Sequence, residues 1–338
     1  MQLSGVAGHT RLTALISRAI ARDTLPPTLL FAGPSGVGKW LVARATAQVL
    51  NCLEPVRNQT RLPLDACGTC RACDRLARGV HVDVIFLEPD ERASIKIDVI
   101  REVLSRTGYR PFEGNRRVVL IREADTLEPA AQNALLKSLE EPPPGTMFIL
   151  TTAVPGALLP TVRSRCMRLR FGRLTSAEVA AVLVRDHDRS EAEARDTAPL
   201  ADGSIGQALA LSDGDVISLR DSAMRLLRQT SGRSDMQARL QAATTLVAGP
   251  SKKERSREDL SVVLRVTAAL LRDIEAINSG ADPRVLANPQ LSVDLTTLAG
   301  AFGGDRARTA FGAVDRARTA LERNAGTKVV AEWLAVQI

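Results

Sequence analysis

Short apolar runs alternate with amphipathic segments over the first half of the chain. The runs that are typical of buried strands lie at 29–32, 82–87, 117–122 and 147–152, and an alternating segment at 166–171 is a further strand candidate. Helical patterns lie between them or before them, at 8–22, 39–50, 95–107 and 128–141. Strands that alternate with helices in this way predict an α/β fold, with a parallel sheet that carries helices on both faces.

The second half of the chain has a different pattern, because from about Leu174 helical periodicity dominates and no convincing strand follows. Thr175–Glu178 has the spacing of a capping box, which starts a helix. A turn-forming stretch at 201–206 separates two short helices. We therefore predict three parts: a sheet domain over 1–173, a small helical domain over 174–214, and an all-helical domain over 215–338.

Composition narrows the class of protein. Apolar residues make up 45% of the 338, and no run reaches the ~18 that a membrane span needs. The N-terminus lacks a charged-then-apolar signal pattern, so we expect a cytoplasmic protein without a membrane partner. The net charge of +7 permits contact with a polyanion without requiring it, since 38 acidic residues are interspersed. An aromatic content of 3% argues against binding single strands by base stacking.

A glycine-rich segment joins the first predicted strand to the helix over 39–50. Its Gly-x4-Gly-Lys spacing is that of a phosphate-binding loop. Glycines let backbone N–H groups close around an anion, and the helix N-terminus favours negative charge there. A chance glycine-rich turn is the alternative. The candidate nucleotide-binding residues are Gly33, Pro34, Ser35, Gly36, Val37, Gly38, Lys39 and Trp40, with Lys39 reaching the β- and γ-phosphates.

Two positions depart from what an ATPase needs. The residue after Lys39 should be Ser or Thr, whose hydroxyl binds Mg²⁺, and here it is Trp40, which has no acceptor. Arg122 stands at the end of the 117–122 strand, where an ATPase carries its metal-holding Asp, and its charge repels Mg²⁺. Glu123 remains as a possible base, although a solvated strand end explains Arg122 and Glu123 equally well. We also expect Arg116 and Arg117 to form a solvated edge.

Four of the five cysteines are clustered. Cys67, Cys70 and Cys73 follow each other at x2 spacing, with Cys52 upstream, and together they offer four thiolates for a structural, tetrahedral Zn²⁺ site. The odd count and the reducing compartment disfavour a disulfide framework. An iron–sulfur cluster or unliganded thiols remain as alternatives. We therefore predict a zinc-binding insert over 52–73.

Three further stretches complete a resemblance. They are Gln132–Pro143 (QNALLKSLEEPP), Phe148–Thr152 and Ser164-Arg165-Cys166. With the phosphate loop and the four cysteines, this pattern resembles bacterial clamp-loader subunits of the AAA+ superfamily over about residues 5–215. Beyond 215 only the helical character matches. The resemblance implies an AAA+ P-loop domain with a zinc-binding insert, a helical lid over 174–214 and a C-terminal oligomerisation collar over 215–338.

The departures point to one class within that family. Trp40, Arg122 and the Gly203–Ala208 segment, which lacks the basic residue of the ATPase subunits, make the chain similar to delta-prime subunits of DNA polymerase III. Such a subunit need not hydrolyse ATP, although ATP or ADP can be bound. Arg165, which alone could be any surface charge, then maps to an arginine finger for a neighbour's γ-phosphate.

That class implies partners as well. It implies a hetero-oligomer with gamma/tau ATPase subunits and delta, which acts through the complex on the sliding clamp and primer-template DNA during replication. The main alternative is an active, gamma/tau-like AAA+ ATPase subunit of the same machine. A zinc-dependent nucleic-acid reader is a third interpretation, disfavoured by the low aromatic content.

Overall fold

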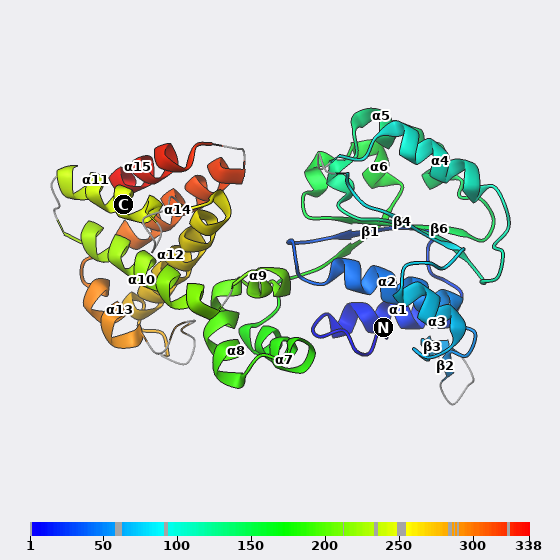
Figure 1. Cartoon of the computed structure of the whole chain (residues 1–338), viewed down its shortest axis with the longest axis horizontal. Coiled ribbons are helices and arrows are strands. Elements are labelled where there is room, and N and C mark those ends of the chain that lie inside the picture. The colour runs from blue at the N-terminus through cyan, green and yellow to red at the C-terminus, as the bar shows by residue number, and fades with distance from the viewer. Residues whose placement is uncertain are drawn as a thin grey trace. The chain divides into compact units, whose positions relative to one another are not determined.

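The computed structural model divides the chain into two compact units. The first comprises Met1–Leu174 with Ser204–Gly206, and the second comprises Thr175–Gly203 with Gln207–Ile338. Figure 1 shows the sheet and its helices in the first unit, and helices throughout the second. The structure describes residues 2–57, 63–90, 94–211, 213–232, 236–248, 255–282, 286, 288, 291–322 and 325–338. Residues 58–62 of the predicted insert therefore lie outside the described residues.

The first unit contains the predicted parallel sheet, with strand order β4-β5-β6-β1-β7. All four of its strand pairs are parallel. The five strands are β1 (Thr28–Ala32), β4 (Val84–Leu87), β5 (Arg117–Ile121), β6 (Thr146–Thr152) and β7 (Met167–Arg170). The prediction from the sequence pattern is thus confirmed for each of these five strands, with boundaries within two residues at every end.

The two faces of the sheet are built from alternating residues. Leu29 and Phe31 belong to one apolar cluster, whereas Leu30 between them belongs to the other. Helices cover both faces, as Figure 1 shows. They are α1 (Thr10–Ala21), α2 (Lys39–Asn51) and α3 (Arg71–Ala77) with the small hairpin β2 (Val56–Arg57) and β3 (Pro63–Asp65) on one side, and α4 (Ile97–Thr107), α5 (Pro129–Glu140) and α6 (Pro160–Ser164) on the other.

Arg117 corrects one expectation. Its side chain is not part of a solvated edge, because it is only 10% exposed and its Nη2 lies 3.1 Å from Oδ1 of the fully buried Asp83. Asp83 also accepts the backbone N–H groups of Phe112, Glu113 and Gly114 at 2.7–2.9 Å. Arg116 does lie at the surface, paired with Asp23. The cation at the start of this apolar run is thus one half of a buried ion pair, whose other half lies in the turn just before β4.

We expect Asp83→Asn to destabilise the first unit by about 3–5 kcal/mol, since Arg117 would lose its buried counter-ion. Burial alone opposes ionisation of Asp83, but the N–H groups of Glu113, Gly114 and Phe112 and the Arg117 guanidinium together hold its pKa below the ordinary value. This stabilisation is therefore complete above the unfolded pKa of about 3.9 and is lost as pH falls through the lower folded value.

Urea unfolding followed by Trp40 fluorescence measures this effect, in a Trp333→Phe background so that only the first unit reports. Asp98→Asn is the matched control, because Asp98 is exposed and its ion pair within the described part of the chain is with Arg101, three residues on. The control should stay within about 0.5 kcal/mol. An Asp83→Asn variant as stable as this control would contradict the role given to Asp83.

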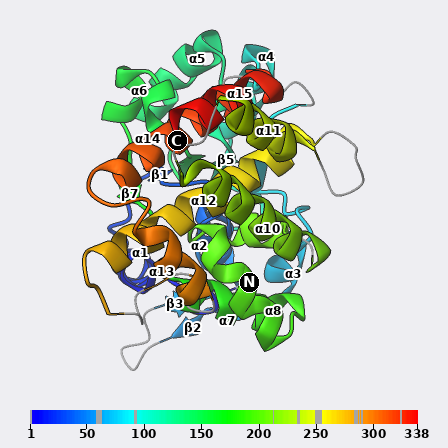
Figure 2. The same cartoon turned by 90° about the vertical axis from the view of Figure 1, so that its left-hand side faces the viewer.

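The second unit is helical throughout its described residues. Its helices are α7 (Ser176–His187), α8 (Glu191–Thr197), α9 (Ile205–Leu209, which begins in the first unit), α10 (Asp213–Thr230), α11 (Met236–Val247), α12 (Arg257–Asn278), α13 (Ser292–Ala299), α14 (Arg306–Glu322) and α15 (Thr327–Gln337). The predicted capping box is confirmed at the start of α7, and Ser190 with Glu193 forms another at α8. The helix α12 packs against α10, α13 and α14 (Figure 2).

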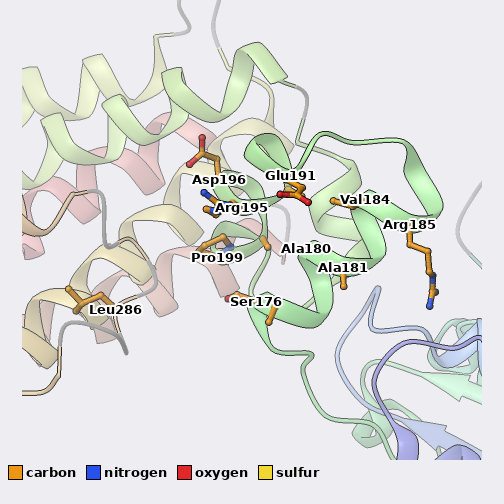
Figure 3. A pocket seen from close by; sticks show the side chains of 13 residues that line it. Ser176, Ala180, Ala181, Val184, Arg185, Glu191, Arg195, Asp196, Pro199 and Leu286 are labelled. Carbon is orange, nitrogen blue, oxygen red and sulfur yellow. The ribbon is translucent and has the colours of Figure 1, made fainter.

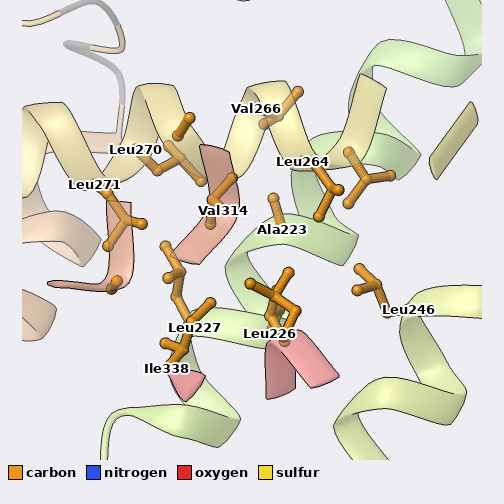
Figure 4. Close-up of a cluster of buried hydrophobic side chains, with 14 of the residues drawn as sticks. Ala223, Leu226, Leu227, Leu246, Leu264, Val266, Leu270, Leu271, Val314 and Ile338 are labelled. Atoms are coloured by element: carbon orange, nitrogen blue, oxygen red, sulfur yellow. The ribbon is translucent and has the colours of Figure 1, made fainter. Parts of the chain in front are cut away.

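One apolar core holds most of these helices together. Leu226 and Leu227 of α10, Leu264 and Leu270 of α12, and Val314 of α14 are buried in it (Figure 4). A separate hollow of about 840 Å³ opens beside α7 and α8 and is lined largely by small side chains such as Ala180, Ala181 and Ala194 (Figure 3). Over the described residues, no helix has the length and apolarity to cross a membrane.

Candidate nucleotide and metal sites

The glycine-rich segment forms a loop between β1 and α2, as its sequence predicts. Gly36 and Gly38 have positive φ values of 71° and 98°, which side-chain-bearing residues rarely adopt. A Cβ on Gly33 would come within 2.3 Å of the Phe171 carbonyl oxygen, and one on Gly36 within 2.2 Å of Ser204 Oγ. These glycines are therefore required by the backbone course and by close neighbours. The loop ends at Gly38, the N-cap of α2.

Lys39 lies under this loop. Its Nζ donates to the carbonyl oxygens of Gly33 (2.8 Å) and Pro34 (2.5 Å), and the residue is almost fully buried. Burial lowers the pKa of Lys39 from 10.5 to about 8, against the opposing effects of Asp125 and Glu123. The ammonium is thus the ordered cation of the loop, with two acidic groups near enough to influence it.

Two segments that sequence reasoning did not connect to the loop touch it. The Gly206 N–H donates to the Gly36 carbonyl oxygen at 3.3 Å, which brings the start of α9 against the loop. His9 Nε2 lies 2.8 Å from the Val37 carbonyl oxygen, and its ring stacks edge-on to Phe171 at 4.9 Å. No local signal marks either contact, because the partners are separated by many residues along the chain.

Trp40 turns its side chain into the fold. Its ring meets that of Phe86 on β4 at 6.1 Å in a T-shaped contact, and Arg44 lies over the same Phe86 ring at 5.6 Å. An indole has one N–H donor and no acceptor oxygen. The position that could present a hydroxyl to a metal therefore packs against apolar neighbours.

The end of β5 carries a small charged network. Arg122 lies 3.4 Å from both Glu88 and Glu123, and all three side chains are about half exposed. Asp125, which the sequence analysis passed over, accepts from Thr152 Oγ1 at 2.6 Å and from the Ala153 N–H at 3.2 Å. The strand end thus holds Glu123 and Asp125 near Lys39, with Arg122 among the acids.

The four predicted cysteines converge. Their Sγ atoms all lie within 4.8 Å of one another, and four of the distances between them are 3.5–3.9 Å. Zn–S bonds of ~2.3 Å in a tetrahedron require S···S edges of ~3.8 Å, whereas a disulfide needs ~2.05 Å. The donor set and spacing therefore fit a tetrahedral ion, and we call Cys52, Cys67, Cys70 and Cys73 the four-cysteine cluster.

Local structure prepares these sulfur atoms to bind a metal. Cys52 is the C-cap of α2 and Cys70 the N-cap of α3, so two helix ends meet at the cluster. The Cys67 N–H donates to Cys52 Sγ and the Cys70 N–H to Cys67 Sγ, each at 3.3 Å. Hydrogen bonds from the backbone at Thr69 and Cys70 lower the pKa of Cys67 from 9.0 to about 6.

The cluster is joined to the body of the first unit. Cys52 and Cys73 belong to the apolar core beneath β1 and α2. Asp65, next to the cluster, accepts the N–H groups of Leu3 and Ser4 at 2.9 Å each. The insert is therefore a structural brace between α2, α3 and the N-terminal segment, not a detached surface loop.

Arg165 follows α6 and is held by an ion pair. Its Nε and Nη2 lie 2.9 and 2.7 Å from Glu140 Oε2, and its Nη1 donates to the Thr161 carbonyl oxygen at 3.1 Å. The Arg165 side chain is 30% exposed and that of Glu140 58%. The guanidinium thus lies at the surface next to α5, and its hydrogen bonds fix its orientation. Arg165 is more than a hundred residues from the phosphate loop along the chain.

The sequence of this chain is similar to those of known DNA polymerase III subunits. Residues 8–175 match the family model described as "DNA polymerase III, delta subunit". The DNA polymerase III subunit delta' of Pseudomonas aeruginosa is 40% identical over 156 residues, 46% of each chain. Subunit tau of Bacillus subtilis is 31% identical over 231 residues, 65% of this chain and 39% of that protein. Over residues 8–175 the chain belongs to the family of DNA polymerase III clamp-loader subunits.

The clamp-loader match falls mainly on the first unit, and the chain spans less than half the length of these curated relatives. The gamma subunit-related protein of Thermotoga maritima aligns over 96% of this chain and 98% of its own, at 16% identity and a TM-score of 0.44. A score of that size carries no argument, so membership rests on the sequence matches. The sequence matches fall mainly on the first unit, a parallel-sheet domain with a glycine-rich loop after β1, and an all-helical region follows.

Proposed function

We propose that this chain is a delta-prime-type clamp-loader subunit that does not hydrolyse ATP itself and supplies Arg165 to an ATP site on a neighbouring subunit. The observation that carries the proposal is the combination of a partly exposed Arg165, held by hydrogen bonds, with a phosphate loop that has Trp40 at its metal-binding position. A trans arginine stabilises the charge on a transferred phosphoryl group. A chain that gives such a group and lacks its own metal ligands is suited to serve its neighbour.

The phosphate loop supports nucleotide binding without turnover. Gly33–Lys39 offers backbone N–H groups, a helix N-terminus and the Lys39 ammonium, which together suit the phosphates of ATP or ADP. Hydrolysis also needs Mg²⁺, which neutralises charge during phosphoryl transfer. Trp40 offers no oxygen to the metal, and Arg122 brings a positive charge to the strand end that should hold it. Residues 33–40 could therefore bind a nucleotide at a site that does not hydrolyse it.

We further propose that residues 174–214 form the lid and 215–338 the collar of the subunit. In this account the collar assembles with gamma/tau and delta subunits into a hetero-oligomer in the cytoplasm. The complex, rather than this chain alone, acts on the sliding clamp and primer-template DNA. The four-cysteine cluster binds one structural Zn²⁺.

Intrinsic hydrolysis by the purified chain is expected to be under about 0.01 s⁻¹, at least a hundredfold below the ~1 s⁻¹ where ordinary enzyme turnover begins. Trp40→Thr alone should not restore activity, because Arg122 would still oppose the metal. Steady-state phosphate release from the chain alone measures both expectations. Lys39→Ala is the control that separates turnover at this loop from a contaminating ATPase. Ordinary turnover that Lys39→Ala abolishes would show that this subunit is itself a motor.

A gamma/tau-like ATPase subunit is the second candidate. The observation that favours it is the pair Glu123 and Asp125, which lie near enough to affect the Lys39 pKa. Glu123 could act as a base, and Asp125 retains one carboxylate oxygen beyond the one bonded by Thr152 and Ala153. The same hydrolysis measurement decides between the two candidates.

A further inference from the structure

We propose that Glu140 is a positioning residue for Arg165, which it holds in the orientation that a phosphoryl group on a neighbouring subunit requires. This inference rests on the proposed function, because it concerns the same arginine. It begins from the ion pair at the surface of the first unit, where Nε and Nη2 of Arg165 both reach Glu140 Oε2.

The bonding pattern leaves one edge of the guanidinium open. Arginine has five N–H groups, one on Nε and two on each Nη. Three are used, by Nε and Nη2 to Glu140 and by Nη1 to the Thr161 carbonyl oxygen. Within the described part of the chain, two therefore stay without a partner, one on each Nη. These two N–H groups belong to the two Nη atoms, which together form the end of the planar fork, and such a fork is suited to grip two phosphate oxygens.

Holding this fork in place is expected to raise the rate of phosphoryl transfer. A free arginine side chain samples many rotamers, and it loses this conformational entropy when it contacts a reacting group. Two bonds to Glu140 and one to Thr161 order the guanidinium before the neighbour arrives, so less ordering remains for the transition state. Glu140 itself lies at the end of α5 and Thr161 in α6, and regular helices provide a firm base for the pair.

Stability alone does not explain the pair. Both side chains are partly exposed, and exposed ion pairs add little to folding. The neighbouring Glu141 carries the same carboxylate and is exposed. Within the described part of the chain it makes no hydrogen bond or ion pair with Arg165. It gives a matched control one residue away from Glu140.

The test uses complexes rebuilt with the partner subunits, in which DNA- and clamp-stimulated ATP hydrolysis is measured. The rate lost on Arg165→Ala defines the part of kcat that Arg165 supplies. Glu140→Ala is expected to remove about half of that part or more, with KM for ATP unchanged, because positioning acts in the transition state. Glu140→Gln should lose less, since its amide oxygen still accepts a hydrogen bond. Glu141→Ala should leave the rate at the parent value.

A double variant completes the test. Added to Arg165→Ala, the Glu140→Ala change should cause no further loss, because it acts only through the arginine. A loss that persists without Arg165, or a Glu140→Ala complex at or above the parent rate, would overturn the positioning role alone. If Arg165→Ala itself left the rate unchanged, the finger and its positioning residue would both be wrong.

Discussion

Removing the metal from the four-cysteine cluster is expected to unfold the insert and to release the N-terminal segment, while the five-stranded sheet persists. A structural zinc site contributes on the order of 10 kcal/mol in small zinc domains, whereas a whole domain is stable by only about 5–15 kcal/mol. The insert is short, and the hairpin strands β2 and β3 have two and three residues. Such an element cannot bury enough apolar surface to stay folded without the ion.

The effect should spread along specific contacts. Asp65 accepts the N–H groups of Leu3 and Ser4, so disorder of the insert frees the N-terminal residues as well. The strands of the sheet make their hydrogen bonds with each other and should exchange amide protons as slowly as before. Hydrogen exchange on Cys70→Ser and on chelator-treated protein, together with elemental analysis, measures both the local loss and the metal content.

Cys166→Ser is the matched control for this experiment. Cys166 is also buried but lies outside the four-cysteine cluster, so this variant should retain one equivalent of zinc. Protein that contains no metal, or that contains iron with visible absorbance, would contradict the zinc site. Full protection of the insert in Cys70→Ser would contradict its role as a brace.

The sheet could be predicted from the sequence because its signals are local. Four of the five strands are short apolar runs and the fifth alternates, and each is followed by a turn or helix signal, so order and type follow without tertiary knowledge. The same holds for the phosphate loop and the four cysteines, whose spacing along the chain already carries their chemistry. The structure brings these cysteines together as expected, although the metal itself stays a prediction.

What could not be predicted depends on partners far apart in the chain. The environment of Arg117 was misjudged because its counter-ion, Asp83, lies 34 residues earlier, in the turn just before the neighbouring strand β4. The contact of Gly206 with Gly36 and the pairing of Arg165 with Glu140 are of the same kind. The short helix α3 was missed because it has only seven residues and begins inside the cysteine-rich segment, where the metal pattern dominates the sequence signal.

Loss of the Arg165 guanidinium is expected to have the largest effect on ATP hydrolysis by the complex. The effect should occur at an ATP site that belongs to a neighbouring subunit. A trans arginine contributes a factor of ~10³–10⁵ at the ATP site it serves. Arg165→Ala should leave folding nearly unchanged, because the side chain is at the surface and its partners among the described residues are Glu140 and a carbonyl group. Arg165→Lys should rescue the rate only in part, since an ammonium lacks the planar fork.

Arg163→Ala provides the control for this change. Arg163 lies two residues earlier, in α6, and its side chain is exposed like much of that helix. Its removal takes away the same charge from the same surface without touching the pair with Glu140. The complex with Arg163→Ala should therefore assemble and hydrolyse ATP as the parent does.

The most direct test of the account is DNA- and clamp-stimulated ATP hydrolysis by complexes rebuilt with Arg165→Ala at equal subunit stoichiometry. The account predicts full assembly and a fall in rate that corresponds to the loss of one site among several, with the Arg163→Ala complex unaffected. An Arg165→Ala complex that assembles fully and hydrolyses ATP at the parent rate would contradict the claim that this subunit supplies a finger to its neighbour.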